Sequence, residues 1–137
     1  MSTTTTTTTT SITQVANVII PVADQDGMVE FYTDVLGLEK RADIPFGDEV
    51  EGRWVEVVPS GGETPIALCP PGPNNEAGGK DTGIGLQTDD IDGYHAQLKG
   101  CGVDVDDEVS RMGAPVPPLF WLRDPEGNQL MVVEVAD

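Results

Sequence analysis

Apolar and polar residues alternate with two different periods along this chain, first a period of two and then one near 3.6. A β-branched stretch opens the pattern and a stretch with apolar residues at helical spacing follows it, which predicts a strand and then a helix. Asp24 is a suitable N-cap residue for that helix, and Gly37 is a suitable residue to end it. Three short stretches of strand character come next. The first half is therefore predicted as βαβββ, at residues 15–22, 25–37, 38–44, 53–58 and 65–69.

The second half of the chain repeats this order. It begins after residues 70–80, which are rich in proline, glycine and asparagine and predict a linker, and Asp90 can cap its helix. The expected elements lie at residues 82–88, 91–102, 103–109, 118–124 and 128–135. Matching positions in the two halves are 64 to 66 residues apart, which indicates an internal repeat. Two such modules cannot each bury a sheet face alone, so we expect them to share one strongly curved, mostly antiparallel sheet.

The predicted domain organisation follows from this repeat. Residues 2–11 are serine and threonine only, with nothing apolar to bury, so residues 1–11 are expected to form a disordered tail. Residues 12–137 are expected to form a single domain. Within it, module one covers residues 12–69, the linker covers 70–80, and module two covers 81–137.

Three segments carry a resemblance to a known family. They are VADQDGMVEFYTDVLGLE in the first half, TDDIDGYHAQLKGCGVDV at the start of the second, and the closing DPEGNQL. Together with the tandem βαβββ modules they resemble the glyoxalase/bleomycin-resistance/extradiol-dioxygenase group, the vicinal oxygen chelate superfamily, over about residues 14 to 135. The resemblance implies an α+β fold in which the modules form a cup-shaped half-barrel, with helices outside and a ligand cavity on the concave face.

The same resemblance locates four positions where metal-dependent members of the family place His, Gln or Glu ligands. The matching positions here are Asn17, Ala67, Gly83 and Met131. The amide of asparagine is a feeble ligand, alanine and glycine have no donor, and a thioether is too soft for most divalent first-row metals. We therefore expect no metal and no cofactor. Met131 has a flexible, polarizable side chain that suits the wall of an apolar cavity.

Candidate ligand-binding residues come from the alternation within the strands. If the apolar set that includes Val18 faces the helices, the opposite set, which includes Asn17, Gln87 and Met131, faces the concave side. Trp54 and Glu56 share one strand face, and the repeat overlays them on Phe120 and Leu122. Aromatic rings beside a carboxylate suit a flat organic ligand with a cationic or hydroxyl handle, although simple core packing is the alternative. The predicted binding set is Asn17, Trp54, Glu56, Gln87, Phe120 and Met131.

Charge excludes several classes of partner. Asp and Glu number 24 against 7 Lys and Arg, for a net charge of -17. Such a surface repels nucleic acid and anionic membranes, so neither is an expected partner. Acidic residues are scattered along the whole chain, which favours a halophilic protein in a salt-rich medium over a surface that binds one basic partner. No apolar run approaches 18 residues and no signal peptide is apparent, so a cytoplasmic location is expected.

The leading functional hypothesis is a metal-independent protein that binds a small organic molecule. In this it would be similar to the bleomycin-resistance proteins, and the resemblance also implies a homodimer whose clefts are completed by the partner. One alternative is a glyoxalase-like lyase or dioxygenase that holds a divalent metal through other ligands, or uses Glu56 as a metal-free base. Another is a non-catalytic interaction protein with an exposed apolar patch. No catalytic residue is identified, because nucleophile motifs are absent and His95 is the only histidine.

Overall fold

The computed structural model describes residues 10–73 and 75–135 and contains two four-stranded sheets. The elements of the first half are β1 (Val18–Pro21), α1 (Gln25–Glu30), a π-helical turn η1 (Phe31–Val35), β2 (Glu39–Pro45), β3 (Arg53–Val58) and β4 (Ile66–Cys69). Those of the second half are β5 (Asp81–Thr88), α2 (Ile91–Gly100), β6 (Asp104–Val105), β7 (Leu119–Arg123) and β8 (Gln129–Glu134). The predicted α+β fold of two βαβββ modules is confirmed.

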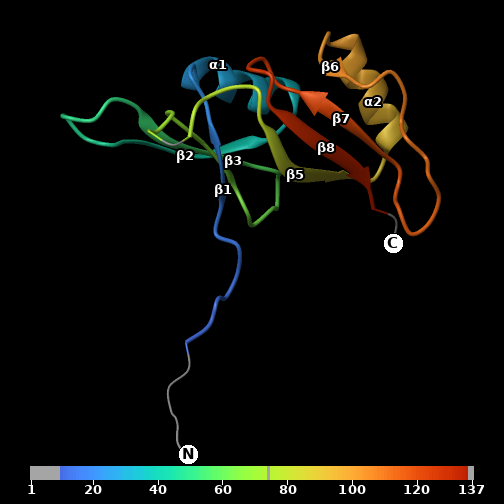
Figure 1. Cartoon of the computed structure of the whole chain (residues 1–137), viewed down its shortest axis with the longest axis horizontal. Coiled ribbons are helices and arrows are strands. Elements are labelled where there is room, and N and C mark those ends of the chain that lie inside the picture. Colours follow the sequence, from blue (N-terminus) through green and yellow to red (C-terminus); the bar gives the residue numbers. More distant parts are fainter. Residues whose placement is uncertain (1–9, 74, 136–137) are drawn as a thin grey trace, which may run out of the picture.

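Both sheets have the same topology. The strand order is β1-β4-β3-β2 in sheet one and β5-β8-β7-β6 in sheet two. In each sheet the first strand of the module pairs with the last one in parallel, and the remaining pairs are antiparallel. A parallel pair needs a long crossover, which the helix and the two intervening strands provide. Both helices lie toward the top of the view in Figure 1, while the N-terminal segment leaves the body from below.

One hydrophobic core spans the two modules. Directly opposed residues on neighbouring strands share a sheet face, and the pairs Val18–Ile66 and Leu86–Val132 both point into this core. Helix residues fill the space above them. The core includes Ile20, Met28, Tyr32, Leu36, Leu68, Leu98, Phe120, Leu130 and Val132. The modules therefore bury their apolar faces against common neighbours, as the repeat predicts.

The first helix differs from the single helix expected over residues 25–37. Its α-helical part ends at Glu30 and a π-helical turn takes over, in which the Leu36 amide donates to the Phe31 carbonyl at 3.1 Å. The Thr33 hydroxyl donates to the Val29 carbonyl at 2.8 Å, and this kind of side-chain bond competes with the regular helical ladder. The apolar face of the helix continues through the π-helical turn, so the periodicity of the sequence does not reveal the change in helix type.

The expected strand at 103–109 is much shorter than predicted. Only Asp104 and Val105 pair with β7. The Asp106 carboxylate then accepts the backbone N–H of Trp121 at 3.0 Å and a hydrogen bond from the Arg123 guanidinium at 2.8 Å. The Asp106 N–H still donates to the Trp121 carbonyl at 3.1 Å, but the Asp106 side chain takes the place of its backbone carbonyl as the acceptor, which ends the regular ladder.

The modules are joined by a buried polar cluster, which we call the inter-module latch and define as Tyr32, Asp124 and Asn128. The Tyr32 hydroxyl of η1 donates to Oδ2 of Asp124 at 2.8 Å, and the Asn128 side chain donates to the same oxygen at 3.0 Å. Oδ1 accepts the backbone N–H groups of Glu126 and Asn128, both at 2.9 Å. Burial, followed by the neighbouring Asp124 charge, raises the pKa of Tyr32 far above its usual range. The phenol therefore stays protonated and remains a donor.

A second contact across the modules involves Glu126, in the turn between β7 and β8. Its carboxylate accepts the backbone N–H groups of Ala23 and Asp24 at 2.8 Å each, immediately before α1. Amide groups at a helix start lack intrahelical partners and favour a negative charge. The DPEGN segment, predicted as a structural turn, thus also completes the start of the first helix.

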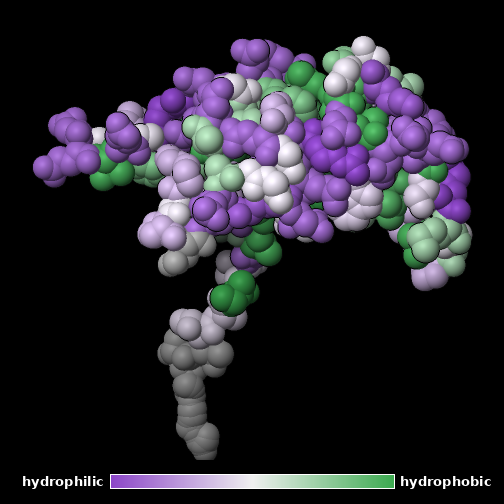
Figure 2. Space-filling view, turned by 45° about the horizontal axis from the view of Figure 1, so that its top comes forward, coloured by the Kyte–Doolittle hydropathy of each residue, from purple (hydrophilic) through white to green (hydrophobic). Residues whose placement is uncertain are grey.

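Hydrophilic residues cover most of the face seen in Figure 2, as the acidic composition predicts. Several basic residues of the described chain form ion pairs with acidic residues. Arg53 contacts Asp43 and Asp26, and its guanidinium keeps the pKa of the Asp43 carboxyl below the usual range. Across residues 10–73 and 75–135, none of the helices is both long and apolar enough to span a bilayer.

Candidate functional site

Each sheet has a face that points away from the hydrophobic core, and we call these two surfaces the open faces. On sheet one, cross-strand pairing brings together residues from β1, β2, β3 and β4, namely Ile19, Ile44, Trp54, Glu56 and Ala67. On sheet two the corresponding set comes from β5, β7 and β8, namely Gly85, Gln87, Trp121, Met131 and Val133. Two of the positions equivalent to metal ligands in the resembling family, Ala67 and Met131, belong to these faces.

The open face of sheet one carries a fixed carboxylate. The Trp54 indole donates from Nε1 to Oε2 of Glu56 at 2.9 Å, and the Arg41 guanidinium lies 3.2 Å from Oε1. The Glu56 side chain is only 13% exposed. Burial, and then the charge of Glu56, raises the pKa of the Cys69 thiol at the end of β4. Each oxygen of Glu56 therefore has a partner on the same sheet, which fixes the orientation of the carboxylate.

The open face of sheet two is built around Met131. A Cβ atom added at Gly85 would lie 3.4 Å from the Met131 methyl group, so glycine leaves the space that this side chain uses. In sheet one the equivalent neighbours are Ile19 and Ala67, with the large residue on the first strand instead. The two open faces therefore have similar strand frameworks but different shapes.

The four positions that match family metal ligands do not form a donor set for a divalent ion. Asn17 directly precedes β1, Ala67 is fully buried, Gly83 has a positive φ of 71°, and Met131 offers a thioether. Elsewhere in the described chain, His, Cys, Asp and Glu side chains do not gather in threes in an arrangement that could hold a metal. The residues present at these positions thus do not fit a zinc, iron or manganese centre.

Phe120 does not lie on an open face, contrary to the sequence overlay. It is fully buried in the core, pairs with Val132, and packs edge-on against His95 with ring centroids 4.8 Å apart. Leu122 is buried in the same core. The overlay of the modules is one residue out of register here, and with a side-chain period of two a one-residue shift moves every side chain to the other face.

Trp121 is the residue that the sequence overlay missed. It is directly opposed to Met131 on the open face of sheet two. The alternation within LFWLR, with Phe120 and Leu122 on one side, is the signal that could have located it. Of the predicted set, Trp54 and Glu56 touch each other on sheet one, Gln87 and Met131 lie on sheet two, and Asn17 flanks β1.

Exposed apolar side chains accompany the open face of sheet one. Ile19 is 50% exposed, Ile44 59% and Phe46 43%. Ile44 and Phe46 lie on or next to β2, in a hairpin that projects from the body in Figure 1. Isolated exposed apolar residues are ordinary, but several on one sheet face are typical of a binding or interaction surface.

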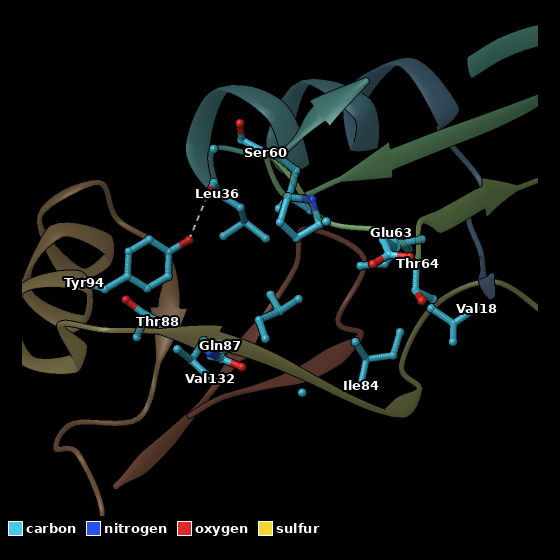
Figure 3. Close-up of a pocket in the computed structure, with 17 residues that line it drawn as sticks. Val18, Leu36, Ser60, Glu63, Thr64, Ile84, Gln87, Thr88, Tyr94 and Val132 are labelled. Carbon is cyan, nitrogen blue, oxygen red and sulfur yellow. Dashed lines mark hydrogen bonds between the residues drawn. The ribbon is translucent and has the colours of Figure 1, made fainter. Parts of the chain in front are cut away.

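A pocket of about 610 Å³ lies where the two modules meet, and we call it the seam pocket. Core-facing side chains form its walls, and Figure 3 shows Tyr94 and Leu36 at one end with Val18, Glu63 and Thr64 at the other. The Tyr94 hydroxyl donates to the Leu36 carbonyl at 2.9 Å, and burial raises the pKa of Tyr94 to about 12. The seam pocket was not predicted, because its residues have the sequence pattern of an ordinary core.

A family model and a solved structure give the same superfamily. The model described as the Glyoxalase/Bleomycin resistance protein/Dioxygenase superfamily matches residues 12–132. TnmS3, an antibiotic binding protein from Streptomyces sp. CB03234, is 30% identical with a TM-score of 0.79, covering 93% of this chain and 100% of its own. A superfamily member from Sphaerobacter thermophilus DSM 20745 is 35% identical with a TM-score of 0.82, covering 90% and 98%. The uncharacterized protein YetH of Bacillus subtilis is 29% identical over 123 residues, which are 90% of this chain and 99% of YetH.

Proposed function

This chain belongs to the glyoxalase/bleomycin resistance protein/dioxygenase superfamily, and from that premise we propose that it binds a small organic molecule without a metal ion. The chemistry at the four family ligand positions carries this proposal. Asn17 has an amide and Met131 a thioether, while Ala67 and Gly83 have no donor atom in their side chains. Together they do not make a site for a Lewis-acid metal. The similarity to an antibiotic binding protein supports the same class of function.

The open faces supply the contacts for such a ligand. Indole rings at Trp54 and Trp121 and the Met131 thioether offer flat, polarizable surfaces, while Glu56 offers a carboxylate already held in place. Planar organic molecules gain from stacking on indole, and a hydroxyl or amine on the ligand can pair with the carboxylate. We include Asn17 and Gln87 as polar contacts at the margins, and we replace Phe120 by Trp121 in the proposed binding set.

A homodimer is part of the proposal. Open faces with exposed Ile19, Ile44 and Phe46 suit a second copy of the chain, since a two-fold interface buries the same patch on both partners. In that arrangement the ligand lies between the sheet of one copy and the sheet of the other. Within each copy, residues 12–137 act as a single domain.

The first prediction concerns ligand binding. Proflavine, a planar tricyclic amine, is expected to bind protein purified without metal, because it matches the indoles and the carboxylate of the open faces. Trp54→Ala should weaken binding about fivefold to tenfold, the equivalent of roughly 1–1.5 kcal/mol for one aromatic contact. Dye anisotropy gives the affinity, light scattering of the same samples gives the oligomeric state, and elemental analysis gives the metal content.

Met112→Ala is the matched control, because Met112 is 75% exposed on a loop outside the open faces. It should leave dye binding unchanged. A metal found at near one equivalent per chain would contradict the proposal and favour a glyoxalase-like lyase or dioxygenase. A different result would favour an interaction protein: the chain forms a dimer with buried open faces, and none of the planar molecules in a screen that includes proflavine binds to it.

The second prediction concerns salt. We propose that the chain works in a salt-rich cytoplasm, a view supported by its net charge of -17. Raising KCl from 0.1 M to 2 M should increase the midpoint of thermal unfolding, because salt shortens the Debye length from about 10 Å to below about 3 Å and screens self-repulsion. Differential scanning calorimetry measures this, and a midpoint that is constant or falls with KCl would contradict halophilic adaptation.

A further inference from the structure

We propose that the seam pocket is a second binding site, separate from the open faces, for an apolar molecule that carries a hydroxyl or amine and no anionic group. Its walls come from the opposite side of the sheets. Val18, Ile66, Ile84, Leu86 and Val132 line it, and all of them point toward the core rather than toward Trp54 or Met131. Of the residues assigned to the open faces, Gly85 and Gln87 also line the seam pocket, whereas Trp54, Trp121 and Met131 do not, so the two ligands would have largely different contacts.

The size and walls of the seam pocket suit a small molecule. About 610 Å³ lies within the range of roughly 300–1,000 Å³ that is usual for small-molecule sites. Aliphatic side chains from four strands and from Leu36 give an apolar interior. The hydrogen bond between Tyr94 and Leu36 closes one end and ties the second module to the first there. A ligand would enter from the other end.

Polar groups occur at both ends of the pocket, with Glu63 and Thr64 at that other end and Ser60 and Thr88 nearer Leu36 and Tyr94 (Figure 3). Glu63, Thr64 and Ser60 come from the segment between β3 and β4, and Gln87 and Thr88 come from β5. The strands β1 and β5 stand at the edges of their sheets, so each has backbone N–H and C=O groups without a strand partner on the pocket side. The polar end of a ligand can thus find both side-chain and backbone hydrogen bonds.

The charges around the pocket determine which polar group a ligand can carry. Among the described residues that line the pocket, Glu63 is the one with a charged side chain, and basic residues do not occur there. Lys40, Arg53, Arg111 and Arg123 are within 3.6 Å of a carboxylate elsewhere. Arg41 donates to the Glu63 backbone carbonyl at 3.2 Å, and its guanidinium also lies 3.2 Å from the Glu56 carboxylate. An anionic ligand would meet the exposed Glu63 carboxylate, while the neighbouring Arg41 guanidinium is already paired with Glu56, which is unfavourable. A neutral or cationic end meets no such barrier.

Two fluorescent probes that differ by a single sulfonate test the proposal. N-phenyl-1-naphthylamine is uncharged, whereas 8-anilinonaphthalene-1-sulfonate has the same rings and a negative charge. Titrations in 1 M KCl reduce the Debye length to about 3 Å, so the comparison reports the pocket rather than the net charge of the whole protein. The uncharged probe is expected to bind once per chain, at least tenfold more tightly than the sulfonate.

Variants then assign the probe to the seam pocket. Ile84→Phe fills its interior and should weaken the uncharged probe at least fivefold. Glu63→Lys should strengthen sulfonate binding at least fivefold, whereas Glu49→Lys, the same charge change at an exposed site on the β2–β3 hairpin, should not. Trp54→Ala should leave the uncharged probe unaffected, which separates this site from the proposed open-face function.

If Ile84→Phe does not fold, Ser60→Trp at the exposed rim provides the blocking variant. The proposal is overturned if the uncharged probe fails to bind, or if it still binds at full affinity when the pocket is blocked. It is also overturned if Trp54→Ala abolishes binding, or if Glu63→Lys and Glu49→Lys have equal effects on the sulfonate. None of these results depends on whether proflavine binds to the open faces.

Discussion

Replacing Asp124 by alanine is expected to lower the free energy of unfolding by about 3–5 kcal/mol, the range observed when one partner of a buried charged network is removed. Asp124 is 4% exposed and accepts hydrogen bonds from Tyr32, Glu126 and Asn128. Without the carboxylate, the Tyr32 hydroxyl and the Asn128 side chain remain buried without an acceptor, and each incurs a desolvation cost. Urea unfolding followed by circular dichroism measures the change.

Two further variants make this test specific. Tyr32→Phe removes one donor and leaves Asp124 with its other partners, so it should cost only about 1 kcal/mol. Asp48→Ala, at an exposed position on the β2–β3 hairpin, should change stability by less than about 0.5 kcal/mol. A loss below about 1 kcal/mol for Asp124→Ala would show that the latch adds little to stability. The slope of the unfolding free energy against urea concentration should be the same for all three variants, because they keep the same fold and expose the same surface on unfolding.

Phe120→Ala and Trp121→Ala are expected to affect different properties although the residues are adjacent. Phe120 is fully buried between sheet two and His95, so its truncation should cost about 3–5 kcal/mol. Trp121 is half-buried on the open face, and its truncation should cost about 1–2 kcal/mol. The affinity for proflavine should depend on the other residue: Trp121→Ala should weaken binding several-fold, and Phe120→Ala should weaken it less. Chemical unfolding and dye titration of both variants provide the two measurements.

The conservative variants Phe120→Leu and Trp121→Phe control for nonspecific effects of truncation. Phe120→Leu should retain most of the stability because it keeps an apolar group in the core. Trp121→Phe should retain most of the dye affinity because it keeps an aromatic face on sheet two. Equal stability losses for the two alanine variants would contradict the assignment of opposite faces.

Much of the fold could be predicted because strong local signals coincide with it. Asp24 and Asp90 each accept a hydrogen bond from the backbone N–H three residues later, at Gly27 and Gly93, so both helix starts were identifiable as N-caps. The repeat in the order of elements then predicted two equivalent βαβββ modules, although not their division into two separate sheets. These features depend on residues near one another in the sequence, where spacing is informative.

The candidate site was harder to predict because it depends on register and on side-chain partners far apart in the chain. Trp54 and Glu56 were identified together since they are two residues apart on one strand. Trp121 was missed because the overlay of the modules carried a one-residue error across a loop of different length. The pairing of Arg41 with Glu56 could not be read from the sequence, and neither could the seam pocket, whose walls meet only after both modules pack.

The contact from Glu126 to the start of α1 also bears on the synthesis of this protein. The carboxylate that completes the first helix lies 103 residues after Ala23, in the last turn of the chain. At about 5–20 residues per second, a ribosome needs roughly 5–20 s to make the intervening segment. During that time the nascent first module has neither the Asp124 partner of Tyr32 nor the apolar neighbours of module two. The module that emerges first therefore completes its structure only when almost the whole chain has been translated.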